Sequence, residues 1–401
     1  MMEACVKTEI SEWIVRAALA GTNEVEIVVG VCQRLSSAGV SLVRSSVATN
    51  LLDPTLDARV VLWIRGQGAL EEAVTRTDDS LANEDWTRSP FFFLIESRQP
   101  SLRRRLDATY RRGEFPLLDG FRDQGVTDYV AFAERVGESV LLGEGEGMVS
   151  SWTTDAPAGF SDAQVEMLAE IMPALTLAFM LRTTNRAART LITTYLGSDA
   201  AERVLAGNIV RGRAQAIRAI VWYSDLIGFT RISDTASPEV VLALLNDYAE
   251  AQVEEIEAHG GHVLKFIGDG ILAIFPDDDT TRACKRALDA ATNLRRRIAA
   301  LNERRQAAGL PVTDTHLALH VGELLYGNLG SPRRLDFTVL GSAVNEAARI
   351  ESLCGSLEQT VIVSWAFAEA AGEARSLLVS LGRYAMKGIA RPQELFTLDP
   401  G

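Results

Sequence analysis

Apolar and polar residues follow two periods along this chain, one typical of strands and one typical of helices. Residues 24–37, EVEIVVGVCQRLSS, space their apolar side chains as an amphipathic helix does. Runs rich in apolar and aromatic residues predict strands at residues 58–66, 89–98, 127–134 and 147–155. This mixture predicts an α/β domain over residues 1–160.

A long helical pattern comes next, from residue 161 to Gly197. Ser161 and Gln164 match a capping box at its start, and Pro173 is expected to kink it. Its apolar residues step by three and four, as in a coiled-coil seam: Val165, Leu168, Met172, Leu175 and Phe179. Two uses fit this stripe equally well, a dimer seam or packing on the first domain. We take residues 161–210 as a helical linker between two domains.

The pattern is clearest over residues 211–401. It predicts a strand, a helix, a hairpin of two strands, a second helix and a further strand, at residues 216–225, 237–261, 262–275, 280–309 and 314–324. This βαββαβ order is the split arrangement of ferredoxin-like domains. Another strand at 334–341 and a helix at 342–355 come after it. The expected fold class is therefore α+β, with an α/β domain in front and a long helix between.

Composition narrows the possible partners. The chain has 401 residues with 53 acidic and 40 basic side chains, a formal net charge of -13. Such a charge opposes binding to nucleic acids or anionic membranes. The apolar window at residues 171–181 is too short to span a membrane, and the first residues show no signal peptide pattern. We therefore expect neither membrane insertion nor a nucleic-acid partner.

The cysteines and histidines carry little chemistry of their own. Cys5, Cys32, Cys284 and Cys354 are scattered without a CxxC pair, which is typical of a reduced, cytoplasmic protein. His259 and His262 lie at a helix-to-strand turn, where a structural role is favoured over metal binding. His316 and His320 share one face of a strand, so a packed pair is favoured over a zinc site.

Two aspartates are the strongest candidates for a site. Asp225 ends the strand at 216–225, and Asp269 lies at the tip of the hairpin. In a split βαββαβ sheet the first strand and the hairpin are neighbours, so both carboxylates could reach one end of the sheet. Paired carboxylates suit Mg²⁺ or Mn²⁺ with phosphate oxygens as further ligands. Asp-Gly is also the commonest hairpin turn, so Asp269 alone could be only a turn residue.

Three segments carry a resemblance to the catalytic domains of class III nucleotidyl cyclases. They are YSDLIGFTRISD, GGHVLKFIGDGILAIF and FTVLGSAVNEAARIES, and the similarity extends from about residue 211 to the C-terminus. The resemblance implies that two Mg²⁺ or Mn²⁺ ions are held by Asp225, Asp269 and the backbone carbonyl of Leu226. Gly228 and Phe229 are expected to face a substrate phosphate through their backbone N–H groups.

The resemblance also assigns the substrate contacts. Lys265 and Thr338 match the two residues that read the base, and threonine in place of the usual aspartate is similar to the class IIIb subgroup. Guanylyl cyclases of this family have glutamate and cysteine there, so ATP is expected as the substrate. Asn345 and Arg349 match the residues that bind ribose and stabilise the transition state. Lys387 matches the lysine that holds the triphosphate.

The implied protein is an adenylate cyclase acting as a homodimer, because the family places the metal ligands on one subunit and the Asn and Arg on the other. Residues 125–136 and 147–168 are similar to GAF-like sensor domains, which implies a small-molecule regulator. The alternative for this region is a dimerising domain without a ligand. The alternatives for the whole chain are a catalytically silent scaffold and a guanylate cyclase.

Overall fold

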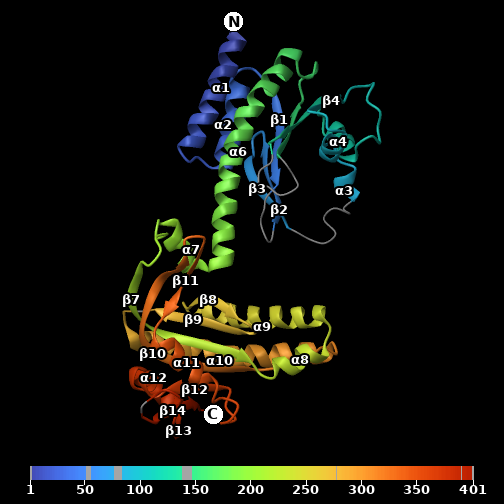
Figure 1. The fold of residues 1–401 in the computed structure, drawn as a ribbon. Helices are drawn as coiled ribbons and strands as arrows, with labels where there is room; N and C mark the ends of the chain where they lie inside the picture. Colours follow the sequence, from blue (N-terminus) through green and yellow to red (C-terminus); the bar gives the residue numbers. More distant parts are fainter. Residues whose placement is uncertain are drawn as a thin grey trace. The chain divides into compact units, whose positions relative to one another are not determined.

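The computed structural model describes residues 2–50, 56–75, 84–137, 147–276, 278–389 and 391–399. The chain divides into two compact units, unit 1 (Met1–Leu191) and unit 2 (Ile192–Gly401). The division falls inside one long helix, α6 (Asp162–Leu196), rather than at either end of the expected linker (Figure 1).

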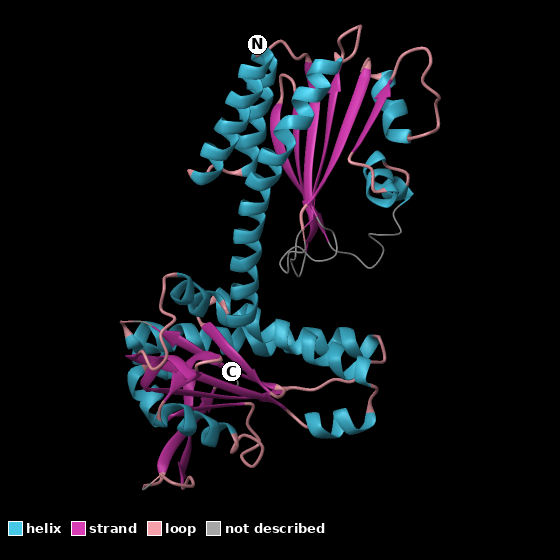
Figure 2. Cartoon of the chain, turned by 45° about the horizontal axis from the view of Figure 1, so that its top comes forward, coloured by secondary structure: helices cyan, strands magenta, loops and turns pink. Residues whose placement is uncertain are grey.

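Within the described residues of unit 1, six antiparallel strands form one sheet in the order β3-β2-β1-β6-β5-β4. Figure 2 draws the strands in magenta. Three of the four predicted strands are present, at β2, β5 and β6. The bounds are β1 (Leu42–Asn50), β2 (Leu56–Ile64), β3 (Gly68–Thr75), β4 (Ser101–Arg105), β5 (Asp128–Arg135) and β6 (Gly147–Thr154).

Helices α1 (Met2–Leu19), α2 (Glu24–Ser37) and α6 share one apolar core with this sheet. Helix α2 has the bounds that its periodicity predicts. It begins where the Asn23 side chain accepts a hydrogen bond from Glu26 N at 2.8 Å, which satisfies one of the free N–H groups of the first turn. Ile27, Val31 and Leu35 are fully buried, as the helical spacing requires.

A second apolar cluster joins the sheet to α4 (Pro90–Ser97) and α5 (Pro116–Asp123), preceded by α3 (Glu84–Thr87). The strand predicted at residues 89–98 is wrong, because this segment is α4. Ser89 Oγ accepts from Phe92 N at 3.1 Å, and Pro90 occupies the first turn, where its missing N–H costs nothing. An apolar run of eight residues is compatible with either element, and these capping signals decide it.

Helix α6 begins with the predicted capping box. Ser161 N donates to Gln164 Oε1 at 3.0 Å, and Gln164 N donates to Ser161 Oγ at 3.2 Å. The helix runs through Pro173 to Leu196. Four residues of the expected seam are fully buried in unit 1, namely Leu168, Met172, Leu175 and Phe179. The stripe therefore packs on the first unit and is not available as a dimer seam.

By length and composition alone, α6 would also pass as a membrane-spanning helix, the one such helix in the described residues. Half of its most apolar window is buried inside the protein. The core helix of a globular protein passes the same test, and the buried residues of α6 pack in the core of unit 1.

Unit 2 contains a mixed sheet whose described strands follow the order β13-β14-β12-β10-β7-β9-β8, with β11 paired to β10 (Figure 2). The predicted βαββαβ order is present as β7-α9-β8-β9-α10-β10. The bounds are β7 (Ala214–Leu226), β8 (His262–Ile267), β9 (Gly270–Pro276), β10 (Thr315–Ser331), β11 (Arg334–Leu340), β12 (Val361–Ser364), β13 (Leu378–Tyr384) and β14 (Gln393–Leu398).

Two long helices, α9 (Pro238–Ala258) and α10 (Thr280–Ala307), pack in one core with the centre of this sheet. Helix α11 (Ser342–Glu351) belongs to a second core with β7, β9 and the β10–β11 hairpin. The remaining helices are α7 (Ser198–Leu205), α8 (Phe229–Thr235), α12 (Trp365–Ala370) and the 3₁₀ helix η2 (Gly372–Leu377). Strand β7 thus contributes side chains to a core on each of its faces, and these two cores hold the strand in place.

Candidate active site

Asp225 and Asp269 lie together at one end of the unit 2 sheet. Strand β7 pairs with β9, and the β8–β9 turn brings Asp269 against the end of β7, where Asp269 Oδ2 accepts from Leu226 N at 3.3 Å. A Cβ atom on Gly270 would lie 2.2 Å from the Ser224 carbonyl oxygen and 3.2 Å from Asp225 Oδ1. Only glycine allows this approach, so the Asp-Gly pair does more than form a turn.

The closeness of the two acids changes their protonation. Burial, the negative charge of Asp269 and a hydrogen bond between the two carboxyl groups raise the pKa of Asp225 to about 6. A pair that resists double ionisation is a site where a divalent cation gains most, because the cation removes the repulsion. The donor set therefore fits Mg²⁺ or Mn²⁺: two hard carboxylates with the Leu226 carbonyl next in the chain.

The charges of the aspartate pair also act on a third acid, Glu351, at the end of α11. Burial, followed by the charges of Asp225 and Asp269, raises the pKa of Glu351 to about 7. His316 Nδ1 lies 3.7 Å from Glu351 Oε1, and His316 is the cross-strand partner of Asp225. The described residues contain no group of three or more His, Cys, Asp or Glu side chains arranged to hold a metal ion. Glu351 therefore lies near the aspartate pair but does not join it as a third metal ligand among the described residues.

The loop after β7 has the conformation expected of a phosphate-facing segment. Gly228 adopts φ 67° and ψ 22°, a left-handed conformation that favours glycine, and a Cβ there would meet no atom within 4 Å. Phe229 begins α8 and packs its ring against the core of unit 2. What Phe229 can offer to a substrate is thus its backbone N–H.

The expected base-reading residues lie on β8 and β11, which contact each other without pairing in the sheet. Lys265 comes directly after a register shift between Val263 and Lys265 in β8, and its Nζ lies 3.1 Å from Asp336 Oδ2 on β11. Thr338 is 3% exposed, and its Oγ1 is buried without a hydrogen-bond partner. A buried hydroxyl without a partner is costly, so it marks a place where a ligand atom would gain.

Helix α11 carries the two remaining catalytic candidates. Asn345 is exposed and Arg349 is half-buried, one helical turn apart on one face. A Cβ on Gly388 would lie 3.3 Å from Arg349 Nη2, so the guanidinium covers the loop that carries the exposed Lys387. Arg349 thus lies against the loop that carries Lys387, and each of these cations is a suitable donor to phosphate oxygens.

Glu351 and Arg349 lie on different sides of α11. Glu351, which senses the aspartate pair, is two residues and therefore about 200° from Arg349 around the helix. Among the described residues, Arg349 forms no ion pair with Asp225 or Asp269. One chain brings together Asp225 with Asp269, Lys265 with Asp336, and Arg349 with the loop of Lys387.

Sequence reasoning missed Asp336 and the position of Glu351. Neither stands out locally, because both lie in segments whose neighbours in space come from elsewhere in the chain. Two of the histidines have hydrogen-bond partners that suit a structural role: His259 Nδ1 is 2.7 Å from the Glu255 carbonyl oxygen, and His320 Nδ1 is 2.9 Å from Ser364 Oγ. Cys32, Cys284 and Cys354 are buried free thiols.

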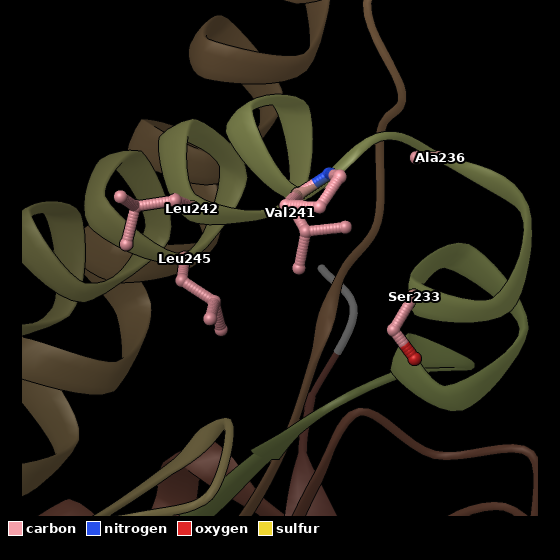
Figure 3. Close-up of a pocket in the computed structure, with 6 residues that line it drawn as sticks. Ser233, Ala236, Val241, Leu242 and Leu245 are labelled. Carbon is pink, nitrogen blue, oxygen red and sulfur yellow. The ribbon is translucent and has the colours of Figure 1, made fainter.

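A separate pocket of about 410 Å³ lies between α8 and α9, and its lining residues are drawn in Figure 3. Leu242, Leu245 and Val241 line it from α9, with Ser233 of α8 and Ala236 on the other side. None of the predicted site residues lines this pocket. The residues that line it are almost all apolar, so the pocket lacks the charged groups that would bind a nucleoside triphosphate.

Comparison with known proteins finds a family model that matches most of unit 2. Residues 214–399 match the family model of the adenylate and guanylate cyclase catalytic domain. Adenylate cyclase 1 of Rhizobium meliloti (strain 1021) is 34% identical over 146 residues, which are 36% of this chain and 22% of the relative. The adenylate cyclase of Anabaena cylindrica is 35% identical over 150 residues, 36% of this chain and 29% of that protein.

The chain thus covers less than a third of the length of either curated relative. Among solved structures, the adenylyl cyclase CyaB from P. aeruginosa is 24% identical, with a TM-score of 0.44 over 47% of this chain and 97% of that chain. The matches to both curated relatives and to this structure span less than half of the chain.

Proposed function

We propose, from the premise that residues 214–399 are an adenylate and guanylate cyclase catalytic domain, that this protein is an adenylate cyclase. It would convert ATP into 3′,5′-cyclic AMP and pyrophosphate. The observation that carries the proposal is the contact between Asp225 and Asp269 at the end of β7, where burial and mutual repulsion prepare a site for divalent cations. The relatives from Rhizobium meliloti and Anabaena cylindrica are adenylate cyclases, which supports the same choice.

The reaction forms one bond and breaks another. The ribose 3′-oxygen bonds to the α-phosphorus as its proton leaves, and the bond from the α-phosphorus to the pyrophosphate oxygen breaks. Two Mg²⁺ or Mn²⁺ ions would lower the pKa of the 3′-hydroxyl and neutralise charge on the phosphates. Asp225, Asp269 and the Leu226 carbonyl would hold these ions, and the backbone of Gly228 and Phe229 would face a phosphate.

The cationic residues would act on the growing negative charge. Arg349 presents a planar, always charged donor for the α-phosphoryl oxygens, and Asn345 on the same helix face would orient the ribose. Lys387, in the loop that Arg349 covers, would hold the β- and γ-phosphates. In the phosphoryl-transfer enzymes where it is measured, such an arginine contributes about 10³-fold or more to the rate.

We propose that each active site is shared between two subunits of a homodimer. Support comes from α11, where Arg349 and Glu351 lie on opposite sides of the helix and only Glu351 senses the aspartate pair. An arginine that points away from its own aspartates can meet those of a second copy. Two equivalent sites would result from the two-fold symmetry.

Purine choice depends on Lys265 and Thr338. The Lys265 ammonium can donate to N1 of adenine, whereas N1 of guanine carries a proton and repels a donor. The buried Thr338 Oγ1, which lacks a partner, can accept from the adenine amino group. ATP is therefore proposed over GTP.

We further propose that unit 1 is a GAF-like regulatory unit of a cytoplasmic protein, controlled by a small molecule. An α/β sheet with helices on both faces is compatible with that assignment. A purely dimerising role is the alternative, and binding of a small molecule to the full chain separates the two.

The test uses variants that are inactive for different reasons. We expect Asp269→Ala and Arg349→Ala to lower cyclic AMP production with Mn²⁺ by at least about 10³-fold each. Mixing the two should restore up to about a quarter of the wild-type rate, because mixed dimers contain one intact site. Asp289→Ala, an exposed acid on α10 paired with Lys285, is the matched control and should keep wild-type activity.

Each result has a clear meaning. Two inactive variants that stay inactive when mixed contradict the shared site. A wild-type chain that cyclises GTP in preference to ATP supports the guanylate cyclase alternative. A wild-type chain that folds and cyclises neither nucleotide supports the silent scaffold.

A further inference from the structure

Unit 1 contains an arginine whose charge has no partner in its surroundings. Arg44 of β1 is partly buried, and within the described residues its guanidinium forms neither an ion pair nor a hydrogen bond. Burial lowers the pKa of Arg44, and Tyr129 and Glu72 oppose that shift only electrostatically. An arginine stays protonated at physiological pH, so it cannot escape this cost by losing its proton. A bound anion would remove the cost.

The polar side chains around Arg44 come from three neighbouring strands. In the register of the sheet, Arg44 of β1 is opposite Thr153 of β6, and Thr153 is opposite Tyr129 of β5. Two positions further along, Ser46 of β1 and Ser151 of β6 are also opposite each other. Residues two apart on a strand point to the same face, so these five side chains lie on one face of the sheet.

The hydroxyl groups on this face are buried, and one of them lacks a partner. Thr153 Oγ1 donates to the Arg44 carbonyl oxygen at 3.2 Å. The Tyr129 hydroxyl is fully buried and has no hydrogen-bond partner in the part of the chain that the structure describes. Burial raises the pKa of Tyr129, while the nearby Ser151 hydroxyl and the charge of Arg44 lower it. A donor that stays protonated and unpaired is therefore directed toward the same place as the guanidinium.

Aromatic rings lie beside these donors. The Arg44 guanidinium carbon is 5.0 Å from the centre of the Phe121 ring on α5. The rings of Phe121 and Tyr129 have centroids 6.3 Å apart, and both belong to one apolar cluster with Leu118 and Ala131. Charged and polar donors next to apolar rings are suited to a ligand with an anionic group on an apolar body.

We propose that this face of unit 1 binds a small organic anion, whose carboxylate or phosphate group is held by the Arg44 guanidinium and the Tyr129 hydroxyl, with its apolar part against Phe121. The inference rests on the proposed small-molecule control of unit 1, and it gives that ligand a chemical class. Carboxylate and phosphate groups share the oxygen acceptors that a planar guanidinium recognises. All of the predicted cyclase residues belong to unit 2, so binding here is measured independently of turnover.

The binding experiment uses the full chain and three probes, namely benzoate, phenyl phosphate and the neutral benzyl alcohol. In calorimetry we expect the anions to bind and the alcohol not to bind, and the tighter anion identifies the preferred group. Arg44→Met should weaken anion binding by at least about 30-fold and Tyr129→Phe by about tenfold, because each removes hydrogen bonds to a charged group. Arg112→Met, an exposed arginine of unit 1 paired with Asp123, is the matched control and should leave the affinities unchanged.

Thermal unfolding separates a binding role from a structural one. Without a probe, Arg44→Met and Tyr129→Phe should melt no lower than the wild type, because each removes a buried polar group that lacks a partner. Benzoate or phenyl phosphate should raise the melting temperature of the wild type and not that of Arg44→Met. If Arg44→Met melts lower than the wild type, Arg44 supports the fold, and the affinities of the conservative Tyr129→Phe variant then decide.

The inference is overturned when neither anion binds the folded wild-type chain at millimolar concentration, or when benzyl alcohol binds as tightly as the anions. It is also overturned when Arg44→Met and Tyr129→Phe bind the anions as the wild type does. Binding through Arg44 that changes the rate of cyclic AMP formation supports the inference and the proposed control together. Binding that leaves this rate unchanged supports the inference and contradicts the control, and binding by a chain that forms no cyclic AMP contradicts only the proposed cyclase activity.

Discussion

At the scale of single residues, the site is defined by charges that the fold forces together. Asp225 and Asp269 come from different elements, and each would ionise freely if it were exposed alone. Burial, together with the charge and hydrogen bond of Asp269, raises the pKa of Asp225 to about 6 from its ordinary value of 3.8. The carboxylate pair is therefore a cost to the metal-free protein at neutral pH, offset only when a cation binds.

The first prediction concerns Asp225→Asn. A carboxyl group with a raised pKa contributes stability that is fully present below pH 3.8 and is lost as the pH rises through about 6. We therefore expect Asp225→Asn to raise the melting temperature of the metal-free protein at pH 8 and to leave it almost unchanged at pH 4. Thermal unfolding in the presence of EDTA at both pH values checks this.

Mn²⁺ provides the control for that measurement. Wild-type protein should gain stability with Mn²⁺ at pH 8 and gain much less at pH 5, because protons compete with the cation for the pair. The variant should show a smaller gain at both values. An equal response of both proteins to Mn²⁺ would remove Asp225 from the metal site.

The residue scale also shows the limit of sequence reasoning. The contact of Asp225 with Asp269 could be predicted from topology and spacing, because a split βαββαβ sheet makes their strands neighbours. The pairing of Lys265 with Asp336 could not, since it depends on how the β10–β11 hairpin folds back over β8. Glu351 was missed because its closeness to the aspartate pair depends on how α11 packs on β7 and β10.

At the scale of elements, the joint between helices α6 and α7 is tightly constrained. Gly197 separates α6 from α7 with φ 79° and ψ 162°, a region that is essentially limited to glycine. A Cβ there would lie 2.7 Å from the Val263 carbonyl oxygen on β8. The same strand carries Lys265 two residues later, so this joint is packed against the proposed base-reading strand.

The second prediction comes from that joint. We expect Gly197→Ala to destabilise the protein by about 2–3 kcal/mol, through backbone strain and a clash with the Val263 carbonyl. Gly207→Ala is the matched control, because Gly207 also has a positive φ of 92° but an added Cβ would meet no atom within 4 Å. It should cost about 1 kcal/mol. Urea unfolding of both variants measures the difference, and equal losses would contradict the close contact.

Elements were predicted well where periodicity is long and badly where runs are short. Helices α2, α9 and α10 and the hairpin β8–β9 could be read directly from spacing and capping residues. Helix α4 was mistaken for a strand, because eight apolar residues carry too little periodicity to separate the two. Strands β12 and β13 lack a distinctive pattern and depend on the rest of the sheet for their pairing.

At the scale of the whole molecule, α6 is the one described helix shared by both units. Its apolar stripe is buried in unit 1 as far as Ala187, and its last turn leads to Gly197 at the start of α7. We propose that α6 carries a change in unit 1 to unit 2. The sequence left the role of this stripe open, and burial rather than spacing decides it.

The third prediction tests that coupling. Four residues inserted near Thr193 would rotate the downstream end of the helix by about 40° and move it by about 6 Å along the axis. We expect this insertion to change cyclic AMP production of the full chain by severalfold. A seven-residue insertion, which keeps the residues in nearly the same angular phase, is the control and should have the smaller effect.

Melting curves of both insertion variants show whether the units stay folded. If both insertions left cyclic AMP production as in the wild type, α6 would be a passive tether.

The two faces of α11 have one more consequence. If the arginine of one copy serves the aspartates of another, a solitary chain has all the parts and no working site. Output would then rise with the square of abundance at low expression and become proportional to it once most copies are paired. The amount of protein in the cell would itself be a signal, and simple dilution would silence it.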